Sequence, residues 1–233
     1  MSFWAECGTF LRESRRHFRT TGALLPSSRF LARALAAPLG RPASRAGNRE
    51  SASAGKPRRV LEVGPGTGSV TRAILRYLRP DDRLDAVELN RRFVDRLQLH
   101  LLHDPLFAPY RDQVRVIHSA VEDLPGEGVY DHIVSGLPLN NFPGWQVRQI
   151  FQAYRRLLKP DGVLSYFEYV LIRQLKTPFV NRRERRRLYR VGRIVGQYIR
   201  TCQVRREQVL MNVPPAIVRH LRLHPDQTLG SRL

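Results

Sequence analysis

The sequence predicts an α/β fold in which helices cover both faces of a mostly parallel β-sheet. Two observations support this prediction. Short apolar segments alternate with helical patterns from residue 60 onward, and a glycine-rich loop follows the first of these segments. Strands that alternate with helices of this length are typical of parallel sheets. Ligands of such sheets bind at the carboxyl ends of the strands, so functional residues are expected there.

The expected elements follow from the local patterns, in chain order. Short runs rich in Val, Ile and Leu predict strands, and apolar residues at helical spacing predict the helices between them. The strands are expected at 60–63, 84–87, 114–117, 132–134 and 163–169. The helices are expected at 70–78, 91–102 and 145–158.

The chain divides into helices at 1–38, a flexible linker at 39–59 and a main domain at 60–233. The linker is rich in Gly, Ala, Ser, Pro and Arg, and it shows no apolar period. The second N-terminal helix should begin at Ser27 or Ser28, because either side chain can cap it.

The first N-terminal helix is expected to be amphipathic, with an aromatic face beside a basic one. A helix of this composition either lies on a membrane surface or packs on the main domain. The apolar face contains Phe3, Trp4, Cys7, Phe10, Leu11 and Phe18, and the basic cluster contains Arg12, Arg15, Arg16 and Arg19.

Charge and cysteine content narrow the class of protein. Lys and Arg total 40 against 20 Asp and Glu, for a net charge of +20. This excess favours an acidic partner: nucleic acid, an anionic membrane surface or an acidic protein. Cys7 and Cys202 provide neither a disulfide framework nor a zinc site. Without an apolar run of roughly 20 residues, we expect a cytosolic protein, with an arginine-rich transit peptide as the alternative.

The strongest motif is the loop that joins the first expected strand to the first expected helix. Gly64, Gly66 and Gly68 let the backbone turn sharply and lie against a ligand. Their spacing fits neither a dinucleotide fingerprint nor a phosphate-binding loop. Glu88 ends the second strand, where an acid can accept hydrogen bonds from both hydroxyls of a ribose. Loop, helix, strand and acid in this order predict a site for S-adenosylmethionine (SAM).

Three further residues are assigned to the same cofactor site. Glu62 lies in the strand that precedes the glycine loop. Ser119 and Ala120 follow the third strand, where a SAM site usually holds the adenine edge with a side chain and a backbone N–H. The neighbouring acids at 122 and 123 are interpreted as the first turn of a helix.

The segment after the fourth strand predicts the acceptor side of the site. Ser135, Gly136, Leu137 and Pro138 are assigned as catalytic, together with Tyr169. Amine-methylating enzymes place a polar-x-Pro-aromatic loop at this position. Backbone carbonyls and a small polar side chain can there align a nitrogen lone pair with the methyl group of SAM. The alternative is an ordinary loop stiffened by proline.

An aliphatic ammonium must lose a proton before it can accept a methyl group, since its pKa is near that of Lys, about 10.4. Asp131, His132, Glu168 and Tyr169 lie near the ends of expected strands and are candidates for assisting this step. None of them stands out, and a strand histidine is more often structural than a base.

Three segments carry a resemblance to a known family: residues 22–33 (GALLPSSRFLAR), 135–143 (SGLPLNNFP) and 212–216 (NVPPA). With them the chain resembles the bacterial phospholipid N-methyltransferases of the Rhizobium/Agrobacterium type, which include related ornithine lipid N-methyltransferases. The resemblance implies a Rossmann-like class I SAM-dependent methyltransferase. It also implies N-methylation of a lipid head-group amine, foremost that of phosphatidylethanolamine, by a peripheral protein on the inner face of the cytoplasmic membrane.

The sequence departs from that family at two positions that concern the site. His118-Ser119 stands where members often have Gly-Asp, and Glu168 stands where a neutral polar residue is expected. The glutamate can signal a different amine substrate, and an ornithine lipid is the alternative acceptor.

An RNA methyltransferase is the alternative from another class, because the net charge suits nucleic acid and ribosomal adenine methyltransferases share this fold. Their acceptor loop reads Asn-Leu-Pro-Tyr, whereas Ser135 and Leu139 stand at the first and last positions here. The aromatic ring that would stack on a base is missing, so the expected partners are an anionic membrane surface and its lipid rather than nucleic acid. A basic helix at 182–200 is a second candidate for membrane contact, or else a solvated charge run with a core stripe.

Overall fold

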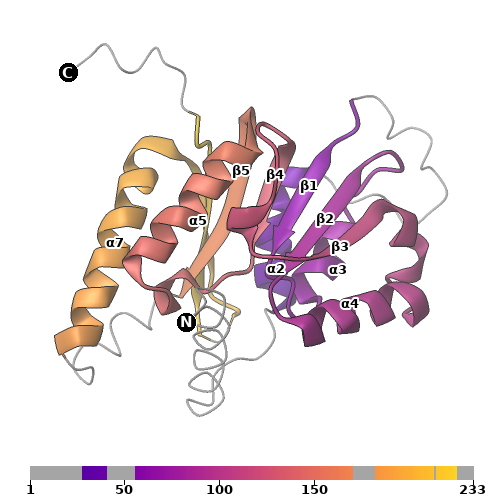
Figure 1. Cartoon of the computed structure of the whole chain (residues 1–233), viewed down its shortest axis with the longest axis horizontal. Coiled ribbons are helices and arrows are strands. Elements are labelled where there is room, and N and C mark those ends of the chain that lie inside the picture. Colours follow the sequence, from indigo (N-terminus) through magenta and orange to yellow (C-terminus); the bar gives the residue numbers. More distant parts are fainter. Residues whose placement is uncertain (1–27, 41–55, 170–181, 213, 225–233) are drawn as a thin grey trace.

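The computed structural model describes residues 28–40, 56–169, 182–212 and 214–224, with side chains for all of these except 182–185. In these residues, seven strands form one sheet in the order β3-β2-β1-β4-β5-β7-β6. The strands β1 to β5 run parallel to one another, whereas β7 and β6 run antiparallel to their neighbours. Figure 1 shows the sheet among its helices, with α7 at one end of the molecule and α4 at the other. The predicted α/β fold with a mostly parallel sheet is confirmed.

Every strand and helix expected between residues 60 and 169 is present, with ends shifted by a few residues. The strands are β1 (Arg59–Val63), β2 (Arg83–Glu88), β3 (Val114–His118), β4 (Tyr130–Ser135), β5 (Leu158–Tyr169), β6 (Gln203–Val209) and β7 (Ala216–Leu221). The α-helices are α2 (Arg29–Ala36), α3 (Ser69–Leu75), α4 (Arg91–His103), α5 (Gly144–Leu157) and α7 (Arg182–Cys202). Short 3-10 helices are η1 (Ala37–Leu39), η3 (Ala108–Gln113), η4 (Val121–Asp123) and η5 (Leu139–Asn141). The acids at 122 and 123 thus lie in a single 3-10 turn.

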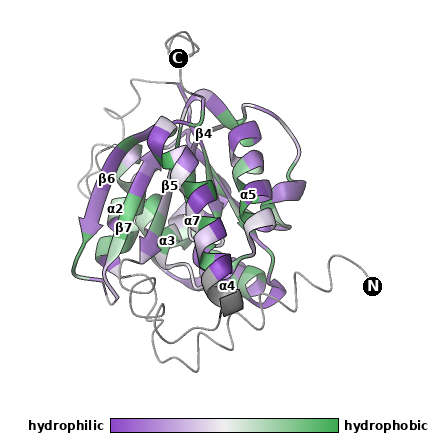
Figure 2. Cartoon of the chain, turned by 90° about the vertical axis from the view of Figure 1, so that its left-hand side faces the viewer, coloured by the Kyte–Doolittle hydropathy of each residue, from purple (hydrophilic) through white to green (hydrophobic). Residues whose placement is uncertain are grey.

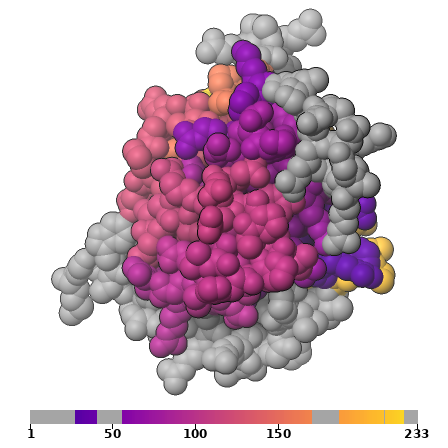
Figure 3. Space-filling view, turned by 90° about the vertical axis from the view of Figure 1, so that its right-hand side faces the viewer, coloured from indigo at the N-terminus to yellow at the C-terminus, as the bar shows by residue number. Residues whose placement is uncertain are grey.

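Helices cover both faces of the sheet. Successive side chains of a strand point to opposite faces, so Val60 packs with the buried residues of α2, α3 and α4, and Leu61 packs with those of α5 and α7. Helix α4 and the 3-10 helix η3 close the end of the molecule beyond β3, which Figure 3 shows as a magenta surface. The two apolar cores hold the strands in register, and this register fixes the position of their carboxyl ends.

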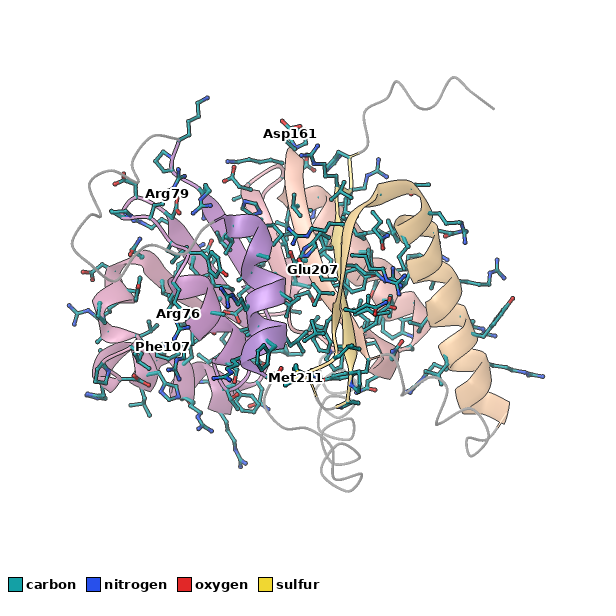
Figure 4. All side chains as sticks on the ribbon, turned by 180° about the vertical axis from the view of Figure 1, so that it is seen from behind. Arg76, Arg79, Phe107, Asp161, Glu207 and Met211 are labelled. Atoms are coloured by element: carbon teal, nitrogen blue, oxygen red, sulfur yellow. The ribbon has the colours of Figure 1, made fainter. Side chains whose placement is uncertain are left out.

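The antiparallel strands β6 and β7 were not expected from the sequence. Strand β6 is exposed along most of its length, so its sequence lacks the alternation that marks a half-buried strand. Figure 2 shows β6 as a hydrophilic ribbon beside the more hydrophobic β7. Ala216, the first residue of β7, pairs with Tyr169 at the carboxyl end of β5. The turn between β6 and β7 therefore lies at that edge, and Figure 4 shows Met211 of this turn at the opposite end of the sheet from Asp161.

The helix α2 is joined to this turn. The hydroxyl of Ser28 accepts a hydrogen bond from the Leu31 N–H at 3.3 Å, so Ser28 caps the helix, as one of the two expected residues. The N–H of Ser28 donates to Oδ1 of Asn212 at 3.1 Å, and Nδ2 of Asn212 donates to the carbonyl of Pro214 at 2.7 Å. Two of the three segments that carry the family resemblance thus meet in space.

Two buried carboxylates fix the amino-terminal edge of the sheet. Asp82 accepts hydrogen bonds from the side chains of Arg58 and Arg79, the latter labelled in Figure 4. Burial tends to raise the pKa of Asp82, but the hydrogen bonds from Arg58 and from two backbone N–H groups outweigh it and lower the pKa to about 2. Asp85 is bonded to two arginines and to the hydroxyl of Tyr130.

The first N-terminal helix, most of the linker and the side chains of 182–185 in the basic segment lie outside the described part of the chain. The domain boundaries at 38 and 59 therefore stay predictions. In α7, Leu188, Val191 and Val195 are buried, so the apolar stripe of this helix is core. Within the described part of the chain, no helix combines the length and apolar character needed to cross a membrane.

Candidate active site

The glycine loop between β1 and α3 forms the centre of the site. The N–H of Gly64 donates to the carbonyl of Val87 at 2.9 Å, which ties the loop to β2. The φ angle of Gly66 is +55°, a left-handed conformation that side chains rarely adopt. A Cβ on Gly66 would meet no atom within 4 Å, so the space beside this residue is open. Gly68 begins α3 as its N-cap. The loop thus presents bare backbone to a ligand.

Glu88 is positioned beside this open space by two backbone groups. Its Oε2 accepts a hydrogen bond from the N–H of Gly66 at 3.1 Å, and its Oε1 accepts one from the N–H of Asn90 at 2.9 Å. The side chain is nearly buried, at 5% exposure. An ionised carboxylate has about four acceptor positions, so Glu88 retains acceptor capacity for the hydroxyls of a ribose.

Glu62 is fully buried beneath the loop, on the face of β1 that α3 covers. Neither of its carboxyl oxygens makes a hydrogen bond of good geometry among the described residues, although Thr71 lies near enough to oppose part of the rise in the pKa of Glu62. Burial, with a smaller effect from the charge of Glu88, raises the pKa of Glu62 to about 8. A buried acid without a partner is costly, and a cationic ligand would provide the missing positive charge.

The residues expected to hold adenine lie at the same edge. The N–H of Ser119 donates to the carbonyl of Glu88 at 3.3 Å, which places Ser119 next to the ribose acid. The hydroxyl of Ser119 donates to the carbonyl of Ala120 at 3.0 Å. Both residues are partly exposed, so a ligand that extends from Gly66 past Glu88 reaches them.

The acceptor loop after β4 packs directly on the glycine loop. The N–H of Gly136 donates to the carbonyl of Val63 at 2.8 Å. A Cβ on Gly136 would fall 2.7 Å from the carbonyl oxygen of Gly64, and a Cβ on Gly64 would fall 2.8 Å from the Leu137 side chain. Only glycine permits this close approach of the two loops, which places the segment 135–138 next to the cofactor loop.

Ser135 faces inward rather than towards an acceptor. Its hydroxyl accepts hydrogen bonds from the hydroxyl of Tyr154 at 2.8 Å and from the N–H of Leu137 at 3.3 Å. The side chain is fully buried. The structure thus gives Ser135 a positioning role, because it fixes the turn at Leu137, and leaves contact with an acceptor to the neighbouring backbone.

A cavity of about 150 Å³ opens beside the acceptor loop. Its walls come from η5, from the end of β5, from α7 and from Arg219 of β7. They include Pro138 and Tyr169, two of the residues assigned to the site, together with Leu139, Asn140, Asn141, Phe167, Glu168, Val191, Gly192, Val195, Gly196, Ile199 and Arg219. We call this cavity the acceptor pocket.

The structure separates the candidates for proton removal. Asp131 and His132 lie in the first half of β4, away from its carboxyl end, and Asp131 is paired with Lys159 at 2.8 Å. Burial lowers the pKa of His132 to about 4, so its ring is neutral at physiological pH. Glu168 and Tyr169 line the acceptor pocket. Of the four residues, only these two can contact an acceptor there.

Sequence reasoning missed the contribution of α7 and β7 to the pocket. Arg219 comes from a strand that was not expected, and Asn141, although it lies in the predicted acceptor segment 135–143, had no role of its own assigned to it. A polar Arg-His pair within the apolar segment 216–221 is the one signal that could have drawn attention to β7.

Residues 60–162 match the family model described as a methyltransferase domain. An ornithine lipid N-methyltransferase from Singulisphaera acidiphila is 29% identical over 46% of this chain and 55% of its own length. A tRNA1(Val) (adenine(37)-N6)-methyltransferase from Pedobacter heparinus is 36% identical over 34% of this chain and 32% of its own length. The matches thus span about half or less of these curated relatives.

Solved structures of other proteins share the fold. A Corynebacterium glutamicum protein superposes with a TM-score of 0.57 at 14% identity, over 92% of this chain and 89% of that chain. The TYW2 protein of Pyrococcus horikoshii, solved in complex with MeSAdo, superposes with a TM-score of 0.51 at 14% identity, over 85% and 64% of the two chains.

The sheet order, the glycine loop and the family match define a Rossmann-like class I methyltransferase fold, and the cofactor is S-adenosylmethionine. The residues present fit this cofactor: open space at Gly66, an oriented acceptor at Glu88 and an unpaired carboxyl at Glu62. Together these findings support a SAM-dependent methyltransferase.

Proposed function

We propose that the protein methylates the head-group amine of a membrane lipid, with phosphatidylethanolamine and ornithine lipid as the two candidate acceptors. The observation that carries the proposal is the acceptor pocket, which adjoins the loop at Pro138 and contains the carboxylate of Glu168. A carboxylate in a small, partly apolar pocket suits an aliphatic ammonium. The ornithine lipid N-methyltransferase among the relatives supports the same acceptor class.

In the proposed reaction the bound ammonium first gives a proton to water, which frees the nitrogen lone pair. An N–CH₃ bond then forms, the S–CH₃ bond breaks, and the sulfur keeps the electron pair. SAM supplies the methyl group and the leaving group when it is bound. The protein's contribution is alignment, which by itself accounts for a large share of such rate enhancements. Gly136 and Leu137 hold the acceptor loop against the cofactor loop, Ser135 and Tyr154 fix its turn, and Glu168 draws the ammonium into the pocket.

The proposed partner is an anionic membrane surface, reached from the cytoplasmic side. The net charge of +20 supports this, because each basic residue near anionic lipid adds about 1 kcal/mol to membrane binding.

A nucleic-acid acceptor is the second candidate, and the similarity to a tRNA adenine methyltransferase favours it. One experiment separates the two. Purified protein is incubated with methyl-labelled SAM and with phosphatidylethanolamine vesicles, ornithine lipid vesicles, total tRNA or ribosomal RNA, and the Gly66→Val variant serves as the inactive control. We expect label in lipid. Label in RNA and none in lipid would refute the lipid proposal.

A further inference from the structure

The acceptor pocket contains two opposite charges side by side. Glu168 is the penultimate residue of β5, and Arg219 lies on the adjacent strand β7, where it pairs with Tyr166 across the sheet. The Arg219 Nε lies 3.5 Å from the Glu168 Oε2, and the two side chains are 15% and 21% exposed. Both line the pocket. A pocket for a bare amine needs only the carboxylate, so the arginine calls for a separate explanation.

Two hydrogen-bond donors of the pocket residues are incompletely satisfied. Nε of Arg219 is buried and has only its ion pair with Glu168 at 3.5 Å, without hydrogen-bond geometry, and the buried Nδ2 of Asn141 makes no hydrogen bond among the described residues. Arg219 does donate through Nη1 to the Gln203 side chain at 2.6 Å, which anchors its guanidinium from the far side. Buried donors without acceptors are uncommon in folded proteins. Their presence here indicates that a ligand brings an acceptor, and an anionic oxygen would satisfy a guanidinium best.

The carboxylate of Glu168 is held in place on its other side. The hydroxyl of Tyr166 donates to the Glu168 Oε1 at 3.2 Å. Burial, with a smaller effect from Glu168, raises the pKa of Tyr166, so its hydroxyl stays protonated and continues to donate. Glu168 therefore stands as an oriented anion between a tyrosine and an arginine.

Helix α7 leaves room for a ligand opposite this ion pair. Gly192 and Gly196, one turn apart, line the pocket without side chains. A Cβ on Gly196 would meet within 4 Å only Nη1 of Arg200, at 3.6 Å. The space is therefore not needed to pack the helix.

We propose that the acceptor pocket recognises a zwitterion: Glu168 holds the ammonium that is methylated, and Arg219 with Asn141 holds an oxyanion of the same head group. This inference rests on the proposed function and narrows its substrate class. Amine lipids that lack an acidic group are then poor acceptors. The oxyanion is a phosphodiester in phosphatidylethanolamine and a carboxylate in an ornithine lipid, and both satisfy the same donors.

The test uses soluble head groups in matched pairs, with binding to the full-length protein measured by calorimetry in the presence of S-adenosylhomocysteine. One pair is glycerophosphoethanolamine and ethanolamine, and the other is alpha-N-acetylornithine and N-acetylputrescine, which lacks only the carboxylate. We expect the zwitterion of at least one pair to bind about tenfold or more tightly than its partner, as a charge-assisted contact predicts. The pair with the larger ratio of affinities shows whether the pocket prefers a phosphodiester or a carboxylate.

Substitutions show which residues are responsible for the preference for the zwitterion over the bare amine. Arg219→Met should abolish the preference for the zwitterion while the bare amine still binds to Glu168, and Arg219→Lys should restore part of the preference. Glu168→Gln should weaken the binding of both compounds in a pair, because both carry the ammonium. Arg222→Met, at an exposed arginine on the segment after β7, is the matched control. Binding of SAM, which uses other strands, shows that each variant is folded.

Lipid assays separate this inference from the proposed function. If wild-type protein methylates lipids but binds each zwitterion no better than its bare amine, the inference is wrong and the proposed function stands. If the zwitterion preference depends on Arg219 while no lipid is methylated, the pocket assignment stands and the lipid function fails. If Arg219→Met weakens binding of the zwitterion and of the bare amine equally, then Arg219 has only a structural role and the inference is wrong.

Discussion

Gly136 lies against the carbonyl oxygen of Gly64, so closely that a Cβ on Gly136 would fall 2.7 Å from that oxygen. The cofactor loop and the acceptor loop are thus in backbone contact, and neither can move without the other. Because the acceptor must approach the methyl group in line, this contact sets the distance between the two halves of the site.

Gly136→Ala is expected to push the two loops apart. Overpacking of this kind costs about 1–3 kcal/mol of stability, and SAM affinity should fall with it because Gly64 is displaced. Calorimetric SAM titration and thermal unfolding check both effects. Gly128→Ala is the control for adding a methyl group without a clash: φ is +57° at Gly128, unlike at Gly136, but its Cβ would meet nothing within 4 Å. It should lower stability slightly and leave SAM binding unchanged, and equal SAM affinity in both variants would argue against coupled loops.

Glu88→Ala should weaken SAM binding strongly. The variant loses the acceptor for the ribose hydroxyls and also the carboxylate that orders the Gly66 N–H, and together these losses are expected to cost about 2–5 kcal/mol. Isothermal titration gives the affinity directly. Asp112→Ala removes an acid whose side chain is 93% exposed and serves as the control. Unchanged affinity in a folded Glu88→Ala protein would remove Glu88 from the site.

The affinity for SAM should rise with pH. The pKa of Glu62 is raised to about 8, so the acid is mostly protonated at neutral pH without ligand. SAM brings positive charge, which favours the ionised carboxylate and lowers that pKa. Binding therefore releases a proton below pH 8, and affinity should increase by up to about tenfold per pH unit in that range. Titrations in buffers of different ionisation enthalpy measure the release. Glu62→Gln should remove it, and a pH dependence that persists in this variant would assign the proton elsewhere.

Asp82→Asn should destabilise the fold. The pKa of Asp82 is lowered from 3.8 to about 2, so its contribution is present above pH 4 and is lost as the pH falls towards 2. The shift corresponds to about 2 kcal/mol at neutral pH. Urea unfolding at pH 7 and pH 3 should show a smaller difference between wild type and variant at the lower pH. A difference independent of pH would show that packing, not charge, explains the loss.

Removal of residues 1–20 should separate membrane binding from cofactor binding. The four arginines at 12, 15, 16 and 19 could supply roughly 4 kcal/mol on an anionic surface, a term that weakens as salt rises. SAM affinity should stay unchanged while co-sedimentation with anionic vesicles and lipid methylation fall together. If the shortened protein sediments as well as the full chain, the basic helix α7 becomes the next candidate.

The cofactor half of the molecule could be predicted from the sequence because local signals agree there. The glycine spacing, the buried strand before it and Glu88 after the next strand each specify a position in the same βαβ unit, and the structure brings them together. The acceptor half depends on contacts between distant segments. Arg219 reaches Glu168 only because β7 runs antiparallel to β5, and the exposed sequence of β6 gives no sign of that pairing.

Ser135 shows a different reason for an incomplete prediction. Its position in the sequence identifies the turn, but the direction of its hydroxyl depends on Tyr154 of α5, which donates to it from within the core. Sequence spacing gives the place of a side chain along a strand. Which neighbour satisfies its polar group is decided by tertiary packing.

The position of β7 between β5 and β6 has a consequence for the newly made chain. The cofactor loop is complete once β3 and β4 have been synthesised, whereas the acceptor pocket needs Arg219, near the end of the described residues. A domain generally folds as a unit, and β7 adds Ala216 and Val218 to the core that contains the buried residues of α2 and α3, so we expect both halves of the site to form only after β7 has been made. A product cut short before β7 would leave the carboxyl half of β5 as an open sheet edge, prone to pairing with other chains. Such a fragment is expected to aggregate through that edge and to methylate nothing.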